Sequence, residues 1–120
     1  MLHFKAHGRC AQRWFASAAW GRPVCYVEVA VDQRATRLVQ VFDNGNILSY
    51  DRTHWCDDFG QLLGLRFSRK PKWRVFFPDA ELIDLAEFER VWSAALQAPL
   101  HKEQLARSRL DKWGPYQVSA

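Results

Sequence analysis

The segment 37–51, RLVQVFDNGNILSYD, constrains the fold of this chain more than any other part of it. Two runs rich in β-branched and aromatic residues flank Asn44-Gly45. A two-residue type I′ turn needs positive φ at both central positions, which Asn and Gly tolerate. The pattern therefore predicts a β-hairpin with a fixed register. Its core face is expected to carry Val39, Val41, Leu48 and Tyr50, and its other face the apolar pair Phe42 and Ile47.

Three further segments have periodic patterns. Residues 24–31 alternate as a strand, with Val27 and Val29 on one face. Residues 72–77 are expected to form another strand, which Pro78 ends. Residues 84–99 predict a helix, because Asp84 and Glu87 have capping-box spacing and Pro99 follows the apolar stripe. That stripe consists of Leu85, Phe88, Val91, Trp92, Ala95 and Leu96.

These elements predict a single α+β domain with an antiparallel sheet of about four strands and one main helix packed on one face. Gly21, Arg22 and Pro23 separate a basic N-terminal arm, 1–23, from the core domain, 24–99. Residues 52–65 are expected to form a loop because Gly60 and Gly64 disfavour a long helix. Residues 100–120 are expected to form a C-terminal helical tail.

The chain carries a formal net charge of +4, and its N-terminal arm is basic. Lys5, Arg9, Arg13 and Arg22 all precede the first acidic residue, Glu28. A basic helix or a loosely ordered extension explains this arm, and an Arg-rich start without acidic residues also fits a mitochondrial presequence. The charge favours anionic partners only mildly.

The number and spacing of the cysteines and the length of the apolar runs predict where in the cell the protein is located. The three cysteines, Cys10, Cys25 and Cys56, are odd in number and lack CxxC spacing. Reduced thiols in a cytoplasmic protein are therefore expected rather than a disulfide framework. No apolar run approaches the roughly 18 residues that a membrane span requires.

The most basic segment, RFSRKPKWRVFF at 66–77, has two interpretations. Its charged residues fit a solvated turn that protects a sheet edge. They also fit a phosphate-binding surface on which Trp73 and Phe76 stack against bases. In a strand, however, Trp73 would face the core and leave Phe76 alone on the basic face. The charged residues are Arg66, Arg69, Lys70, Lys72 and Arg74.

Candidate metal and catalytic groups are sparse. His3, His7 and Cys10 would share one face of a helix, but structural zinc sites favour paired CxxC-like spacing. His54 and Cys56 lie close in sequence, whereas a thiolate–imidazole pair is normally assembled from distant segments. No nucleophile-elbow, phosphate-loop or zinc-protease motif occurs. We therefore expect no enzyme, no metal site and no cofactor.

One resemblance to known proteins is visible. The strand YVEV, the hairpin VQVFDNGNILSYD and the helix AEFERVW resemble small bacterial α+β domains that occur near polymorphic-toxin loci, some of them candidate immunity proteins. The match covers about residues 26–97. It implies a non-enzymatic protein that blocks another protein, such as a toxin. Immunity proteins against nucleases are often acidic, whereas this chain is acidic only locally.

The leading hypothesis is a cytoplasmic protein-interaction module of the immunity or antitoxin type. It would cover a site on a partner with exposed acidic residues: Asp57, Asp58, Asp79, Glu81 and Glu89. The alternative is a nucleic-acid-associated protein that uses the basic 66–74 stretch together with Arg9 and Arg13. The pattern leaves the oligomeric state open, because Phe42 and Ile47 would be exposed in the expected register.

Overall fold

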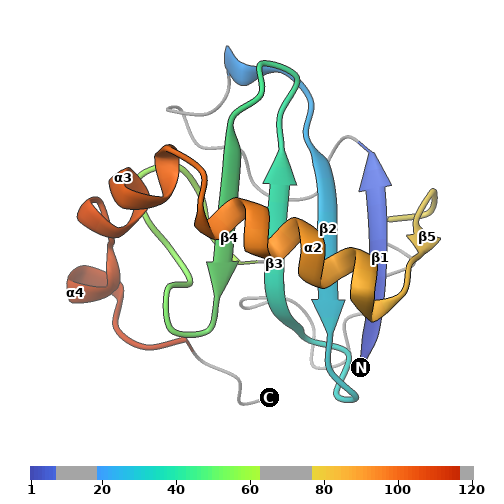
Figure 1. The fold of residues 1–120 in the computed structure, drawn as a ribbon. Helices are drawn as coiled ribbons and strands as arrows, with labels where there is room; N and C mark the ends of the chain where they lie inside the picture. Colours follow the sequence, from blue (N-terminus) through green and yellow to red (C-terminus); the bar gives the residue numbers. More distant parts are fainter. Residues whose placement is uncertain (8–18, 63–76, 117–120) are drawn as a thin grey trace.

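The computed structural model describes residues 1–7, 19–62 and 77–116, and it confirms the α+β class. One antiparallel sheet has the strand order β4-β3-β2-β1-β5 (Figure 1). The strands are β1 (Leu2–His7), β2 (Val24–Val29), β3 (Ala35–Val41), β4 (Ile47–Asp51) and β5 (Glu81–Leu82). The described helices are α2 (Leu85–Leu96), α3 (Leu100–Ala106) and α4 (Leu110–Trp113). None of them is long and apolar enough to cross a membrane.

The first strand corrects the prediction of a separate N-terminal arm. Residues 2–7 lie inside the sheet, where β1 pairs with β2 on one side and β5 on the other. Phe4 and Ala6 are buried on one face, and Lys5 lies on the opposite face. The strand also removes the premise of the metal hypothesis, because a helix is needed to bring His3 and His7 together. Cys10, Arg9 and Arg13 lie outside the described residues.

The hairpin exists, but its predicted turn and register are wrong by one residue. Among its turn residues only Gly45 has positive φ, and its backbone N–H donates to the carbonyl of Phe42 at 2.9 Å. This is a three-residue loop in which a type I turn precedes a bulge glycine, instead of the two-residue type I′ turn. Val39 consequently pairs with Ser49 instead of Tyr50.

A slip of one residue moves every side chain of one strand to the other face. Leu48 and Tyr50 therefore share a face with Leu38 and are separated from Val39 and Val41. Phe42 is buried rather than paired with Ile47 in solvent, and it contacts Trp20 edge-on. The idea that an exposed Phe42 forms a dimer seam is thereby excluded.

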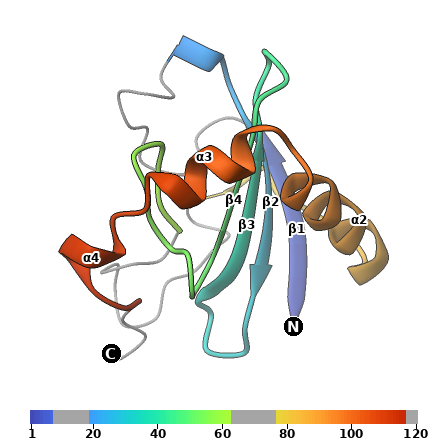
Figure 2. The ribbon, with the colours of Figure 1, turned by 60° about the vertical axis from the view of Figure 1, so that its left-hand side comes forward.

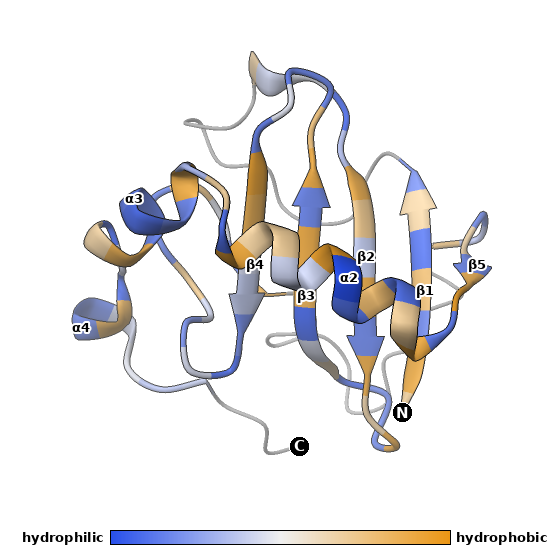
Figure 3. Ribbon diagram, in the orientation of Figure 1, coloured by the Kyte–Doolittle hydropathy of each residue, from blue (hydrophilic) through white to orange (hydrophobic). Residues whose placement is uncertain are grey.

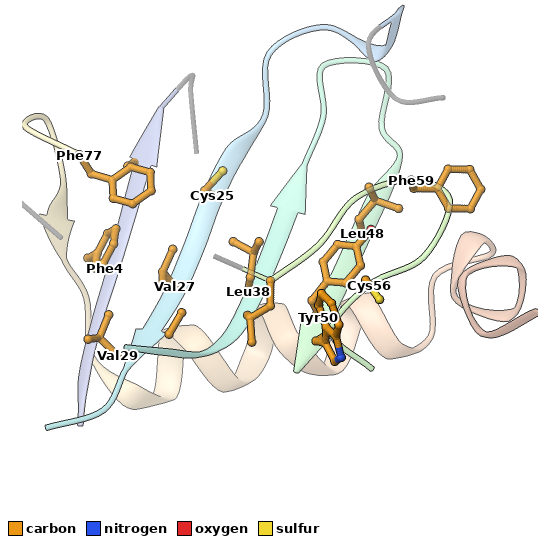
Figure 4. Packing of buried hydrophobic residues seen from close by; sticks show 14 of the residues in the cluster. Phe4, Cys25, Val27, Val29, Leu38, Leu48, Tyr50, Cys56, Phe59 and Phe77 are labelled. Carbon is orange, nitrogen blue, oxygen red and sulfur yellow. The ribbon is translucent and has the colours of Figure 1, made fainter. Parts of the chain in front are cut away.

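The main hydrophobic core lies on the sheet face opposite α2. Phe4, Val27, Leu38, Leu48 and Tyr50 point from the strands to this side (Figure 4). Residues of the segment after β4 cover them, and turning the molecule shows α2 on the other side of the sheet (Figure 2). Phe77, the only described residue of the expected 72–77 strand, packs against Phe4 with ring centroids 5.3 Å apart.

Helix α2 crosses the second face of the sheet, as predicted for the 84–99 segment (Figure 1). The Asp84 side chain accepts a hydrogen bond from the Glu87 backbone N–H at 2.8 Å, which confirms the N-cap. Phe88 and Ala95 are buried under the helix, and Trp92 is half-buried. Leu85 and Leu96 remain exposed, so only part of the apolar stripe packs against the sheet.

The expected tail helix is divided into α3 and α4, because residues 107–109 pair with the loop that follows β4. Asp57 forms an isolated bridge with Ser108. Gln104 of α3 is fully buried, and its amide donates to the Ser49 carbonyl at 2.9 Å and accepts from the Ser49 N–H at 3.1 Å. This side chain therefore pairs with the outer edge of β4 as a neighbouring strand would.

The cysteines differ from the expectation of three reduced thiols. Cys25, which is buried in β2, takes part in a disulfide bond. Cys56 is a free and fully buried thiol.

Candidate functional site

Three of the predicted partner-binding residues are exposed around the corner where β5 leads into α2. Asp79, Glu81 and Glu89 all lie at the surface. Glu81 approaches Lys5 at 3.6 Å, whereas Glu89 is held by Arg37. The sheet and helix therefore bring Asp79 and Glu81 to one region, and Glu89 belongs to a network one turn along α2.

A groove of about 480 Å³ opens beside this corner, between the start of β1 and the first turn of α2. In Figure 1 this is the region where the N-terminus lies next to the beginning of α2. Its polar lining includes Asp84 at the rim and the buried pair His3 and Glu28. Its apolar lining consists of Met1, Leu2, Leu82, Ile83 and Leu85.

Exposed apolar side chains mark the rim of this groove. Met1, Leu82 and Leu85 have exposed fractions of 76%, 57% and 54%. Along the chain these residues interrupt hydrophilic ones, as the mixed colours around β5 and the start of α2 show (Figure 3). The groove therefore combines exposed apolar side chains with the carboxylate of Asp84 at its rim.

Glu28 forms the centre of a charged network beneath α2. Its carboxylate accepts hydrogen bonds from His3 at 2.9 Å, from the Thr36 hydroxyl at 2.6 Å and from Arg37 at 2.6 and 2.9 Å. Burial raises the pKa of Glu28, but the hydrogen bonds from Arg37, Thr36 and His3 outweigh it and lower that pKa to about 2. The carboxylate is therefore ionised and fully engaged, which makes it a poor proton acceptor.

Arg37 connects this network to α2. Its guanidinium pairs with Glu89 as well as Glu28 and lies 4.8 Å from the Phe88 ring centroid and 5.2 Å from that of Trp92. Hydrogen bonding to Glu28 raises the pKa of Arg37 above its usual range. The contacts fix the helix on the sheet, so Glu89 serves the fold here and is less available to a partner than Asp79.

Asp57 does not lie at the surface, which corrects its nomination as a partner-binding residue. It is fully buried, and its carboxylate accepts from the Tyr50 hydroxyl at 2.7 Å and from His54 at 2.9 Å. The Gln104 amide and the backbone N–H groups of residues 59 and 60 also donate to it. With both oxygens saturated, this carboxylate holds the 52–62 loop together.

Asp58, the fifth predicted partner-binding residue, and the candidate catalytic pair His54 and Cys56 are engaged within the fold as well. Asp58 forms an ion pair with Arg109 at 2.6 Å. Burial raises the pKa of the Cys56 thiol to about 11, so the thiol is not ionised near neutral pH and is a weak nucleophile. His54 stacks on the ring of Tyr50, with centroids 5.9 Å apart. Through their hydrogen bonds to Asp57, His54 and Tyr50 hold the loop that follows β4 in place.

The remaining sequence-based sites are absent from the described regions or do not assemble there. Arg66, Arg69, Lys70, Lys72 and Arg74, the residues of the nucleic-acid alternative, all lie outside the described residues. Within residues 1–7, 19–62 and 77–116, no three His, Cys, Asp or Glu side chains are grouped as metal ligands.

Sequence reasoning missed the groove and the network beneath it. The alternation of His3 and Lys5 with Phe4 and Ala6 is a strand signal, but the basic charge of residues 1–23 favours the prediction of an arm instead. No local pattern places Glu28 next to His3, because residues 25 positions apart meet only through strand pairing.

Comparison of the chain with protein-family models, with curated proteins and with solved structures gave no match in any of the three.

Proposed function

We propose that this chain is a non-enzymatic protein-interaction domain of the immunity or antitoxin type, which blocks a basic partner protein. The observation that supports this proposal is the groove at the β5–α2 corner, where exposed Leu82 and Leu85 lie beside the carboxylate of Asp84. The resemblance of residues 26–97 to candidate immunity domains agrees with this class of function.

The composition of the groove indicates what a partner presents to it. Lysine and arginine side chains have an apolar stem and a charged end, so they complement an apolar wall with a carboxylate at its rim. Glu28 at the inner side is already neutralised by Arg37, and Glu81 lies near Lys5, which leaves Asp84 as the outward-facing carboxylate of the groove lining. We therefore propose that the partner inserts a basic side chain between Leu82 and Leu85.

The state of the candidate catalytic groups supports the non-enzymatic part of the proposal. Asp57 is saturated with hydrogen bonds, and the thiol of Cys56 is buried with a raised pKa. An interaction domain needs only a complementary surface, and its inhibition of the partner would be steric and electrostatic.

The disulfide bond at Cys25 bears on the compartment in which the protein acts. The cytoplasmic location expected from the sequence stays a prediction, and the disulfide bond at Cys25 is evidence against it, since disulfides persist mainly in oxidising compartments. An immunity protein that acts outside the reducing cytoplasm is consistent with both the groove and the disulfide.

The test begins with the product of the gene adjacent to the one that encodes this chain, assayed for binding by titration calorimetry. Leu85→Ser should weaken binding by about 30-fold, as expected for an apolar hot-spot residue. Leu105→Ser is the matched control, because Leu105 has a similar exposed fraction of 53% but lies on α3. Its affinity should equal that of the wild type.

A second variant tests the contribution of the Asp84 charge separately from that of the apolar side chains. Asp84→Asn retains an N-cap oxygen and removes the negative charge, so it should lower the affinity and reduce its dependence on salt. Equal binding by wild type, Leu85→Ser and Asp84→Asn would contradict the proposal. So would steeply salt-dependent binding to nucleic acid with no protein partner, which would favour the basic-stretch alternative.

A further inference from the structure

Two arginines lie at the end of the sheet where β3 begins and β4 ends, the lower end in Figure 1. Arg34 directly precedes β3 and is 5% exposed. Its backbone N–H donates to the Asp32 carboxylate at 3.0 Å. Within the described residues, however, its guanidinium forms no hydrogen bond or ion pair. Its nitrogens are not among the fully buried atoms that lack a partner, so solvent still reaches this guanidinium and is the only compensation for its charge within the described residues.

Arg52 follows β4 and is also incompletely paired. Its Nε donates to the Ala35 carbonyl at 3.4 Å, near the long limit of a hydrogen bond. Its Nη2 is buried and has no hydrogen-bond partner in the described part of the chain. The guanidinium lies 5.5 Å from the centroid of the Tyr116 ring.

The ring of Tyr116 is buried at the same end of the sheet as the two arginines. It is buried against Trp55, with ring centroids 6.2 Å apart. Burial raises the pKa of the Tyr116 hydroxyl, while the positive charges of Arg52 and Arg34 oppose that rise and Asp32 adds to it. Arg52 lies over the Tyr116 ring, and its Nε donates to the carbonyl of Ala35, the residue after Arg34, so the fold places the two arginines at the same end of the sheet.

This arrangement has the chemistry of an anion site. Two neighbouring arginines repel each other, and Asp32 supplies one negative charge beside Arg34. The buried Nη2 of Arg52 still has no partner in the described part of the chain, and a bound water or ion can satisfy such a donor. Arginine presents its donors in a planar fork that matches the oxygens of carboxylate and phosphate groups. Among the described acids, none forms an ion pair with Arg34 or Arg52.

We propose that Arg34 and Arg52 bind a small oxyanion, a phosphate or carboxylate group, next to Tyr116. The site is independent of the groove at the β5–α2 corner: it uses other elements, and its existence neither requires nor excludes a protein partner.

The experiment uses the indole N–H of Trp55, which donates to the Gly114 carbonyl at 2.8 Å, as an NMR reporter beside the site. Inorganic phosphate and acetate are titrated separately into the full chain, with ionic strength held constant by sodium chloride. A saturable shift with a dissociation constant on the order of 1 mM is expected for at least one of the two anions. The stronger of the two identifies the preferred oxyanion.

Three variants make the assignment specific. Arg52→Gln and Arg34→Gln should each weaken binding about tenfold, since each removes charge-assisted hydrogen bonds. Arg90→Gln is the control, because Arg90 is exposed on α2 and the charge change is identical. Its titration should match the wild type.

A linear shift without saturation for both anions would overturn the proposal. So would equal weakening by Arg52→Gln and Arg90→Gln, which would indicate only a general charge effect. If the glutamine variants do not fold, Arg52→Lys keeps the charge but loses the fork. Binding by Arg52→Lys as tight as that of the wild type would then also overturn the site.

Discussion

Asp57 and Asp58 are adjacent in the sequence but have different roles in the structure. Asp57 is buried and accepts hydrogen bonds from Tyr50 and His54, which precede it closely in the chain, and from the distant Gln104 of α3. Asp58 has a partly exposed side chain and one ion pair, with Arg109. Nothing in the dipeptide itself distinguishes the two residues, because their difference comes entirely from what the fold places around each carboxylate.

Substitutions of Asp57 and Asp58 can be compared for their effect on the free energy of unfolding. Asp57→Asn should lower the free energy of unfolding by about 3 kcal/mol, because it removes a buried charge from several charge-assisted hydrogen bonds. Asp58→Asn should cost less than about 1 kcal/mol, as expected for a partly exposed ion pair. Urea unfolding followed by tryptophan fluorescence measures both. Equal costs would show that the network around Asp57 is not a loop anchor.

Glu28 gives the protein a pH-dependent contribution to stability. Its pKa falls from 4.5 to about 2 on folding, because the hydrogen bonds from Arg37, Thr36 and His3 outweigh the effect of burial. A carboxyl group with a lowered folded-state pKa stabilises the native state above its unfolded pKa. That contribution is lost as the pH falls from about 4.5 towards 2.

We therefore expect the wild type to lose on the order of 2 kcal/mol of stability through this group over that acidic range, after allowance for solvent screening. Glu28→Gln should be less stable than wild type at pH 7, and the difference should shrink as the pH approaches 2. Urea titrations at a series of pH values measure it. A difference that stays constant with pH would contradict the assignment.

At the scale of elements, the hairpin strands, β2 and α2 followed from their patterns, but β1 and the details of register did not. The apolar alternation of 37–51 and the cap at Asp84 predicted the hairpin and α2. The hairpin loop is one residue longer than Asn44-Gly45 implied, because only Gly45 adopts positive φ. The two turn types use similar residues, and the choice depends on which face the flanking side chains bury.

Helix α3 protects the edge of β4 through one side chain. The Gln104 amide satisfies both backbone groups of Ser49, and exposed strand edges otherwise tend to pair with other chains. Because this side chain is fully buried, its loss should leave the backbone groups of Ser49 unpaired and remove one of the donors to Asp57.

Gln104→Ala should therefore cost about 2 kcal/mol of stability and increase the hydrogen-exchange rate of the Ser49 amide. Lys102→Ala, an exposed change on the same helix, is the control and should leave that amide protected. Hydrogen exchange followed by NMR measures the effect. An unchanged exchange rate at Ser49 in Gln104→Ala would show that the edge does not depend on this residue.

In the whole molecule, the sheet separates two different environments. One face carries the main apolar core, and the other supports α2 through the charged network around Glu28. The disulfide at Cys25 lies on the core face, and Cys56 is buried on the same side. The two cysteines are therefore both sequestered, but only one of them is oxidised.

This difference predicts a labelling pattern. Protein isolated without reductant and alkylated in denaturant should be labelled at Cys56, while Cys25 should become labelled only after reduction. Mass spectrometry of the peptides distinguishes the two sites. Labelling of Cys25 without reduction would restore the expectation of reduced thiols and, with it, the cytoplasmic location.

The sequence by itself determined the class of the fold, the hairpin, the capped helix and the acidic character of the β5–α2 corner, because each depends on local periodicity, turn chemistry or composition. Tertiary structure decided that residues 2–7 form a strand inside the sheet, which face each hairpin residue occupies, and which aspartate is buried. It also assembled the groove from β1 and α2. These features depend on strand pairing between distant segments, and only the packed molecule fixes which of the available registers buries the most apolar surface.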